Sequence, residues 1–118
     1  MEKMIAWVEI PTTNFERGVE FYQDLLGVEL KSEKSEQEKM ACFPTGEGAI
    51  IHSPGFEPSG QGVVVSLNAG EKLDETLQKV EKLGGKIVRA KTKIEAEGMG
   101  YFALFSDSEG NRIGLYGQ

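Results

Sequence analysis

Two segments of this 118-residue chain have the apolar spacing of an amphipathic helix. The first set of apolar positions is Phe15, Val19, Tyr22 and Leu25, and the second set is Leu73, Leu77, Val80 and Leu83. Steps of three and four residues place each set on one face of a helix. The spacing therefore predicts two helices, one in each half of the chain.

Both predicted helices carry boundary signals. Thr13 to Glu16 matches a capping box, in which the Thr13 hydroxyl and the Glu16 carboxylate bind free backbone N–H groups at the helix start. Each apolar pattern then runs into a glycine, Gly27 in the first half and Gly84 in the second. Because glycine adopts a left-handed conformation at little cost, we expect each helix to end there.

Short β-rich stretches surround each helix in the same order. In the first half they are residues 4–10, 28–33, 40–43 and 49–52, and in the second half 62–68, 86–90, 102–105 and 111–115. Glycine-containing tetrads at 45–48 and 107–110 join the last two stretches of each half as hairpins. The pattern predicts two βαβββ modules, about 1–53 and about 62–118, joined by a linker at 54–61 within one α+β domain of residues 1–118.

A single βαβββ module has one helix and about four strands, which cannot cover both faces of a sheet. Two such modules side by side place their helices on the outer face and curve a mixed sheet around a cleft. We therefore expect a small-molecule cleft between the two halves.

Three segments carry a family resemblance: Glu9 to Tyr22, Gly84 to Lys86, and the closing run Phe105 to Leu115. Through them the chain resembles the vicinal oxygen chelate superfamily, which includes glyoxalase I, the bleomycin resistance proteins and the extradiol dioxygenases. The resemblance covers nearly the whole chain and implies paired βαβββ modules around a cleft. It does not specify a reaction, since this fold hosts many.

The resemblance also implies four metal-ligand positions in the cleft. They correspond here to Trp7, His52, Gly62 or Val64, and Gly114. Only His52 has a side chain that can bind a metal, and one imidazole does not make a coordination shell. We therefore expect no catalytic metal, and with it no glyoxalase or dioxygenase mechanism.

Alternation along the strands predicts which side chains enter the cleft. If Gly114 faces inward, the inward set is Trp7, Glu9, Ile50, His52, Arg112 and Tyr116. Ile51, Ile113 and Leu115 would then face the helices. Tyr101, which follows a glycine-rich segment, would belong to a flap over the ligand.

Glu9 and His52 are the candidate catalytic residues, and each has a simpler alternative. Glu9 would be a general base or a cation anchor, or else a solvated carboxylate or an ion-pair partner of Arg112. His52 would be a proton donor, or else a structural hydrogen-bonding residue. Together the two side chains would hold a divalent metal only weakly, with water completing the shell.

The remaining candidates are ligand-binding residues. Trp7 and Tyr116 would stack on a planar or cationic ligand, or else simply pack at the mouth of the cleft. Arg112 would clamp a carboxylate, or else lie solvated on its strand. Cys42 alternates with apolar neighbours, and we expect a buried, inert thiol.

Composition limits the partners and the compartment. With 13 basic and 19 acidic residues the formal net charge is −6, which argues against nucleic-acid binding. One cysteine suits a reducing compartment, and residues 1–4 show no secretory signal, so we expect a cytoplasmic protein. No apolar run is long enough to cross a membrane.

These observations favour a protein that binds a small hydrophobic or cationic molecule. The alternative is a metal-independent isomerase or lyase that uses Glu9 as base and His52 or Tyr116 as acid. A third possibility is a lyase with an atypical metal shell. The resemblance to the resistance proteins further implies a homodimer.

Overall fold

The computed structural model describes residues 4–118, so the expectation about an N-terminal signal falls partly on residues 1–3, outside the described part. The chain divides into two units, one running to Pro58 and the other beginning at Ser59. This division lies within the segment 54–61 that the sequence suggests as a linker. We call the two units the first and the second module and describe each by itself.

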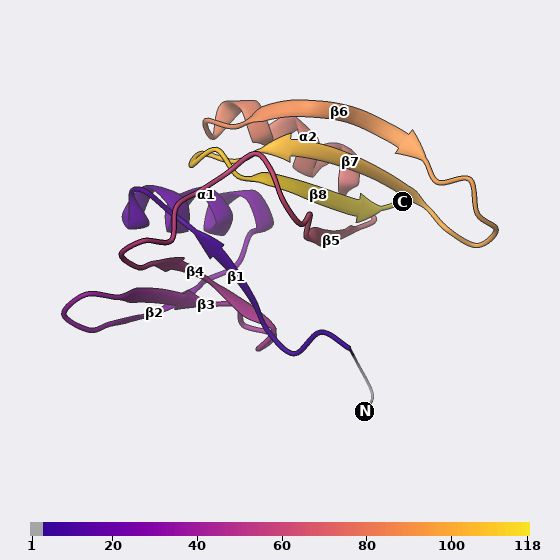
Figure 1. Cartoon of the computed structure of the whole chain (residues 1–118). Coiled ribbons are helices and arrows are strands. Elements are labelled where there is room, and N and C mark those ends of the chain that lie inside the picture. Colours follow the sequence, from indigo (N-terminus) through magenta and orange to yellow (C-terminus); the bar gives the residue numbers. More distant parts are fainter. Residues whose placement is uncertain (1–3) are drawn as a thin grey trace. The chain divides into compact units, whose positions relative to one another are not determined.

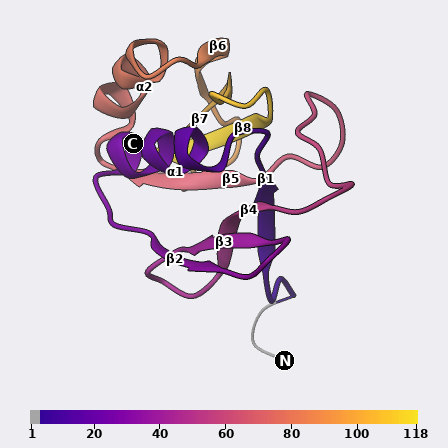
Figure 2. The ribbon, with the colours of Figure 1, turned by 90° about the vertical axis from the view of Figure 1, so that its left-hand side faces the viewer.

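The first module follows the order βαβββ. Its elements are β1 (Val8–Pro11), α1 (Phe15–Leu26), β2 (Lys31–Lys34), β3 (Lys39–Cys42) and β4 (Gly48–His52). The strands form one mixed sheet in the order β1-β4-β3-β2, with β1 parallel to β4 and the other neighbours antiparallel (Figure 2).

The second module repeats this plan. Its elements are β5 (Ser66–Gly70), α2 (Leu73–Lys82), β6 (Lys86–Lys93), β7 (Tyr101–Ser106) and β8 (Arg112–Gly117). The sheet has the order β5-β8-β7-β6, and α2 lies along one of its faces (Figure 1). The predicted α+β fold with two βαβββ modules is confirmed.

The helices end where the glycines predict, but α1 starts differently. Asn14, not Thr13, is the N-cap, and its side-chain oxygen accepts a hydrogen bond of 3.0 Å from the backbone N–H of Arg17. Gly27 closes α1 in the left-handed conformation, with φ 66°. The second helix ends at Lys82, and Gly84 follows with φ 100°. The capping-box prediction was therefore one residue too early.

The first strand of each module begins later than the sequence suggests. Because β1 pairs with β4 only from Val8 onward, residues 4–7 precede the ladder and are exposed. In the second module, β5 begins at Ser66, opposite Gly114. The apolar character of residues 4–7 and 62–65 therefore does not reflect burial in a strand.

Each module has its own apolar layer between helix and sheet. In the first module α1 packs on β4, and in the second α2 contacts β5, β6 and β8. These layers include the buried side chains of Ile10, Phe15, Tyr22, Leu25, Ala41 and Ile50 in the first module, and of Leu73, Val80, Ala103, Phe105, Ile113 and Leu115 in the second. Within residues 4–118, neither helix has the length and apolarity needed to cross a membrane.

Candidate functional site

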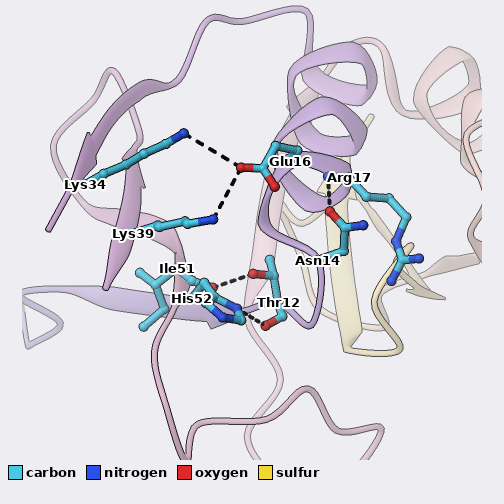
Figure 3. A network of polar contacts seen from close by, with 8 residues as sticks. All are labelled: Thr12, Asn14, Glu16, Arg17, Lys34, Lys39, Ile51 and His52. Atoms are coloured by element: carbon cyan, nitrogen blue, oxygen red, sulfur yellow. Dashed lines mark hydrogen bonds and ion pairs between the residues drawn. The ribbon is translucent and has the colours of Figure 1, made fainter. Parts of the chain in front are cut away.

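The salt bridges of α1 identify the two faces of the first sheet. Lys34 and Lys39 reach the carboxylate of Glu16 on α1, at 3.8 and 3.6 Å, so both lysines lie on the helix side (Figure 3). Directly opposed residues in a ladder share a face, and neighbours along a strand alternate. The face away from α1, which we call the first open face, is formed by Glu9, Pro11, Lys31, Glu33, Met40, Cys42, Ala49 and Ile51.

Trp7 and Glu9 form a hydrogen-bonded pair at the edge of this face. The indole Nε1 of Trp7 donates to Oε2 of Glu9 at 3.1 Å. Trp7 is 42% exposed, and Glu9 is also exposed. Among the described residues of the first module Glu9 has no ion-pair partner, and the alternative of an ion pair with Arg112 of the second module stays a prediction. An aromatic ring beside an unneutralised carboxylate is suited to a cationic or polar aromatic ligand.

His52 and Ile50 lie on the other side of the sheet from the one that strand alternation predicts. His52 stands opposite Lys39, and Ile50 stands opposite Ala41, both on the α1 face. Ile50 is fully buried there. Ile51, expected against the helix, is on the first open face instead. The prediction that Ile50 and His52 share a face with Trp7 and Glu9 is therefore wrong.

The cause is the length of the hairpin between β3 and β4. Cys42 pairs with Ala49, whereas in the second module Ser106 pairs with Arg112, so the first connection is one residue longer. A shift of one residue moves every following side chain to the opposite face. Transferring the orientation of β8 onto β4 at a constant offset consequently inverted β4.

His52 is bound to the backbone at the start of the α1 segment. Its Nδ1 lies 3.1 Å from the carbonyl oxygen of Thr12, and because a carbonyl only accepts, Nδ1 carries the proton (Figure 3). The Thr12 hydroxyl in turn donates to the carbonyl oxygen of Ile51 at 2.8 Å. This leaves Nε2 as the nitrogen available to a ligand. Thr12 was not among the predicted site residues, and a hydroxyl two positions after the predicted strand 4–10 was the available signal.

A hollow of about 340 Å³ lies at the end of β2, β3 and β4 in the first module. It is bordered by residues from both faces of the sheet end and by the loop that follows β4. Its lining residues are Glu9, Glu33, Lys34, Ser35, Glu38, Lys39, Met40, Ile51, His52, Ser53 and Phe56. Glu9 and His52 thus border one hollow although they extend from opposite faces of the sheet.

Arg112 and Tyr116 lie as strand alternation predicts. On β8, Ile113 and Leu115 are buried and stand opposite the buried Phe105 and Ala103. The alternate residues therefore face away from α2, on what we call the second open face. This face is formed by Ser66, Asn68, Lys86, Arg89, Thr92, Phe102, Leu104, Ser106, Arg112, Gly114 and Tyr116.

Tyr116 and Tyr101 have different surroundings. The Tyr116 hydroxyl accepts a hydrogen bond from the backbone N–H of Gly100 at 3.2 Å, which fixes the ring orientation. Tyr101 belongs to β7, not to a flap, and has the parity of the buried Ala103 on the α2 side. Its ring lies 4.5 Å from the Lys91 ammonium group. The expectation that Tyr101 covers the ligand beside Tyr116 is therefore not supported by its position.

The residues at the family's ligand positions do not fit a metal. The Trp7 nitrogen is a donor already bound to Glu9, and a side chain at Gly114 would collide with Ser66. Gly62 and Val64 precede β5, and Val64 has no donor atom. Within residues 4–118 no group of three or more His, Cys, Asp and Glu side chains is arranged to hold a metal ion.

Cys42 differs from the expected buried thiol. It is only half-buried, it has no disulfide partner, and it lies on the first open face opposite Ala49.

The sequence did not predict the positions of Lys86 and Arg89, which extend the charge of Arg112 across the second sheet. Their spacing around a β-bulge in β6 hid the shared face.

Comparisons with known proteins agree with this architecture. Residues 4–115 match the family described as Glyoxalase/Bleomycin resistance protein/Dioxygenase superfamily. A search among curated proteins found no significant match.

Solved structures with the same fold cover nearly the whole chain. A glyoxalase/bleomycin resistance protein/dioxygenase family enzyme from Burkholderia phytofirmans PsJN is 17% identical, with a TM-score of 0.72 over 96% of this chain and 97% of the other. A glyoxalase/bleomycin resistance protein from Albidiferax ferrireducens T118 is 18% identical, with a TM-score of 0.70 over 98% and 99%. The fosfomycin resistance protein FosX from Mesorhizobium loti is 14% identical, with a TM-score of 0.65 over 100% and 93%. At these identities the likeness establishes the fold alone.

Proposed function

Because the chain belongs to the glyoxalase/bleomycin resistance protein/dioxygenase superfamily, we propose that it binds a small organic molecule without a catalytic metal. The observation that carries the proposal is the exposed Trp7–Glu9 pair on the first open face. The pair offers a flat aromatic surface and a negative charge in a family whose members include drug-binding resistance proteins. Under this proposal the ligand is hydrophobic or cationic. The expectation of one cleft shared by both modules stays a prediction.

The donor set at the family's metal positions supports the metal-independent part of the proposal. Among these positions only His52 offers a side-chain lone pair to a cation, whereas catalytic zinc sites use three protein ligands. A ligand that binds this protein should therefore bind equally well after dialysis against a chelator. Loss of binding on chelation, restored by one divalent ion, would contradict this part.

A thermal-shift screen against metabolites and antibiotics tests the proposal directly, because any compound that binds the native state raises the midpoint of unfolding. Trp7 is the only tryptophan of the chain, so its emission reports on the first open face. We expect a hit to shift the midpoint and to change Trp7 emission with the same dissociation constant. Hits that leave the emission unchanged would place the binding site elsewhere.

The alternative is a lyase or isomerase that uses Glu9 as base and His52 as acid. The observation that favours it is the shared hollow at the end of the first sheet, which both residues border. His52 would act through Nε2, since Nδ1 is bound to Thr12. Glu9→Gln should then abolish turnover, whereas a binding protein would lose only affinity for cations.

We also propose that the protein is a cytoplasmic homodimer, as the family resemblance implies. Exposed apolar side chains outside the sheets, such as Ile5 and Val63, would lose contact with water if such association covered them. Size-exclusion chromatography with light scattering tests this: a mass of twice 12.9 kDa is expected, and a mass of 12.9 kDa at micromolar concentration would overturn it.

A further inference from the structure

The second open face carries three cationic side chains and no carboxylate. Lys86, Arg89 and Arg112 project from this face, and all three are exposed. The other paired positions on the face are polar, aromatic, aliphatic or glycine. The carboxylates of the second module lie on or beside α2 or in the loops and turns at the ends of the strands. In a chain of net charge −6, this face is therefore free of carboxylates, whereas the α2 side carries charges of both signs.

The three cations have no acidic partner within their own module. No carboxylate of residues 59–118 forms an ion pair with Lys86, Arg89 or Arg112. On the α2 side of the same sheet, by contrast, Lys91 is paired with Asp74 at 3.1 Å. Basic side chains left unneutralised on one face make that face attractive to an anion.

The register places two of the cations around a hydroxyl. Lys86, Ser106 and Arg112 stand directly opposite one another on β6, β7 and β8. Neighbouring strands are separated by about 4.8 Å, so the backbones of Lys86 and Arg112 lie about 10 Å apart with Ser106 between them. Two long cationic side chains can reach one anionic group over Ser106 from this spacing.

Arg89 extends the cluster and is oriented by an aromatic ring. Its guanidinium carbon lies 4.9 Å from the centroid of Phe102. A guanidinium held on a ring loses less freedom on binding, and it can form paired hydrogen bonds with a carboxylate or phosphate. Phe102 and Leu104, on the same face, supply apolar contact for the rest of a ligand.

We propose that the second open face binds the anionic group of a small organic ligand, a carboxylate or a phosphate, between Arg112 and Lys86 with Arg89 beside them. The inference rests on the proposed small-molecule function and gives the second module a site of its own, for a ligand that carries an anionic group. Three cations are too few for a nucleic-acid backbone, whose binding requires many phosphate contacts.

Titration by two-dimensional NMR with phenyl phosphate, benzoate and benzyl alcohol tests the inference. We expect both anions to bind more tightly than the neutral alcohol and to shift the amide signals of Ser106 and Arg112. Arg112→Gln and Lys86→Gln should each weaken anion binding about fivefold, the loss of one partly exposed charge pair. Raising the salt concentration should weaken anion binding further.

Lys82→Gln is the matched control, because it removes an exposed positive charge from α2 of the same module. It should leave anion binding unchanged. Anions that bind no tighter than benzyl alcohol, or equal effects of Arg112→Gln and Lys82→Gln, would overturn the inference. A protein that binds oligonucleotides but neither of the two small anions would overturn the inference as well. In each case a Trp7-reported hit from the thermal-shift screen would leave the proposed function standing.

Discussion

Thr12 and His52 hold the end of β4 against the segment that enters α1. The Thr12 hydroxyl donates to the carbonyl oxygen of Ile51, and Nδ1 of His52 donates to the carbonyl oxygen of Thr12. Two side chains thus exchange hydrogen bonds with backbone atoms 39 and 40 positions away in the sequence. The sole histidine is thereby fixed in one tautomer with Nε2 free of this contact.

Replacing Thr12 with valine should destabilise the protein. Thr12 is 1% exposed, so Thr12→Val leaves the carbonyl oxygen of Ile51 without this donor in a buried place. The expected loss is about 1–3 kcal/mol in the free energy of unfolding, measured with urea. Thr12→Ser keeps the hydroxyl and should lose clearly less. Equal losses in both variants would show that the hydrogen bond contributes nothing.

Glu16 should make stability depend on pH in the acid range. A backbone hydrogen bond at Glu16, aided by Lys39 and Lys34, holds the pKa of its carboxyl below the ordinary value of 4.5. A lowered pKa in the folded state stabilises the protein above pH 4.5, and this stabilisation is lost as the pH falls through the folded pKa. The urea midpoint of the wild type should therefore exceed that of Glu16→Gln at pH 7, and the two should converge once the pH is below the folded pKa of Glu16.

The control for this prediction is Glu20→Gln, an exposed carboxylate on the same helix. It removes the same charge without the contacts of Glu16 to Lys34 and Lys39. If Glu20→Gln reproduces the pH dependence of Glu16→Gln, net charge is responsible and the local contacts are not.

Gly114 should not tolerate a side chain. A Cβ at this position would collide with the Ser66 hydroxyl, and the Cβ of Ser66 would be 3.3 Å away. Gly114→Ala should therefore cost about 1–3 kcal/mol in thermal or urea unfolding. Ser66→Ala removes the closer atom, so the double variant should recover part of the loss. Additive effects of the two substitutions would mean that they do not touch.

Glu9 should discriminate between cationic and neutral ligands. Glu9→Gln should weaken the binding of benzyltrimethylammonium, followed through Trp7 emission, about fivefold at low salt and less at high salt. Binding of benzyl alcohol should not change. Glu29→Gln, an exposed carboxylate outside the sheet, is the matched control. Equal weakening of both ligands would assign Glu9 a structural role.

The repeat of helices, strands and glycines was sufficient to predict the fold. The helix ends at Gly27 and near Gly84, and the buried alternation of Ile113 and Leu115, follow from local chemistry alone. Arg112 and Tyr116 were placed on the correct face because β8 alternates without interruption. Helix-end signals and strand alternation predicted these features correctly because none of them depends on pairing with a distant strand.

The orientation of His52 was predicted wrongly because the turn before β4 was matched incorrectly to the turn before β8. The turn in the first module starts at Phe43, with the N–H of Gly46 bound to the Phe43 carbonyl, and the turn in the second module starts at Asp107 with Gly110 in the same role. Matching Gly48 to Gly110 instead of Gly46 to Gly110 concealed the extra residue. Pro44 at the second turn position was the local signal for the correct match.

The salt bridges and the cationic face were beyond sequence reasoning for another reason. Lys34 and Lys39 meet Glu16, and Lys86 meets Ser106, only once strand register is known. Register depends on pairing between distant residues, and β6 adds bulges that local alternation does not reveal.

The unequal hairpins turn corresponding positions of the two last strands toward different surfaces. In β4 the half-buried His52 lies on the α1 side and is held by the backbone of Thr12. In β8 the exposed Arg112 lies on the face away from α2. A substitution transferred from one last strand to the other at a constant offset would therefore alter the opposite side of the sheet.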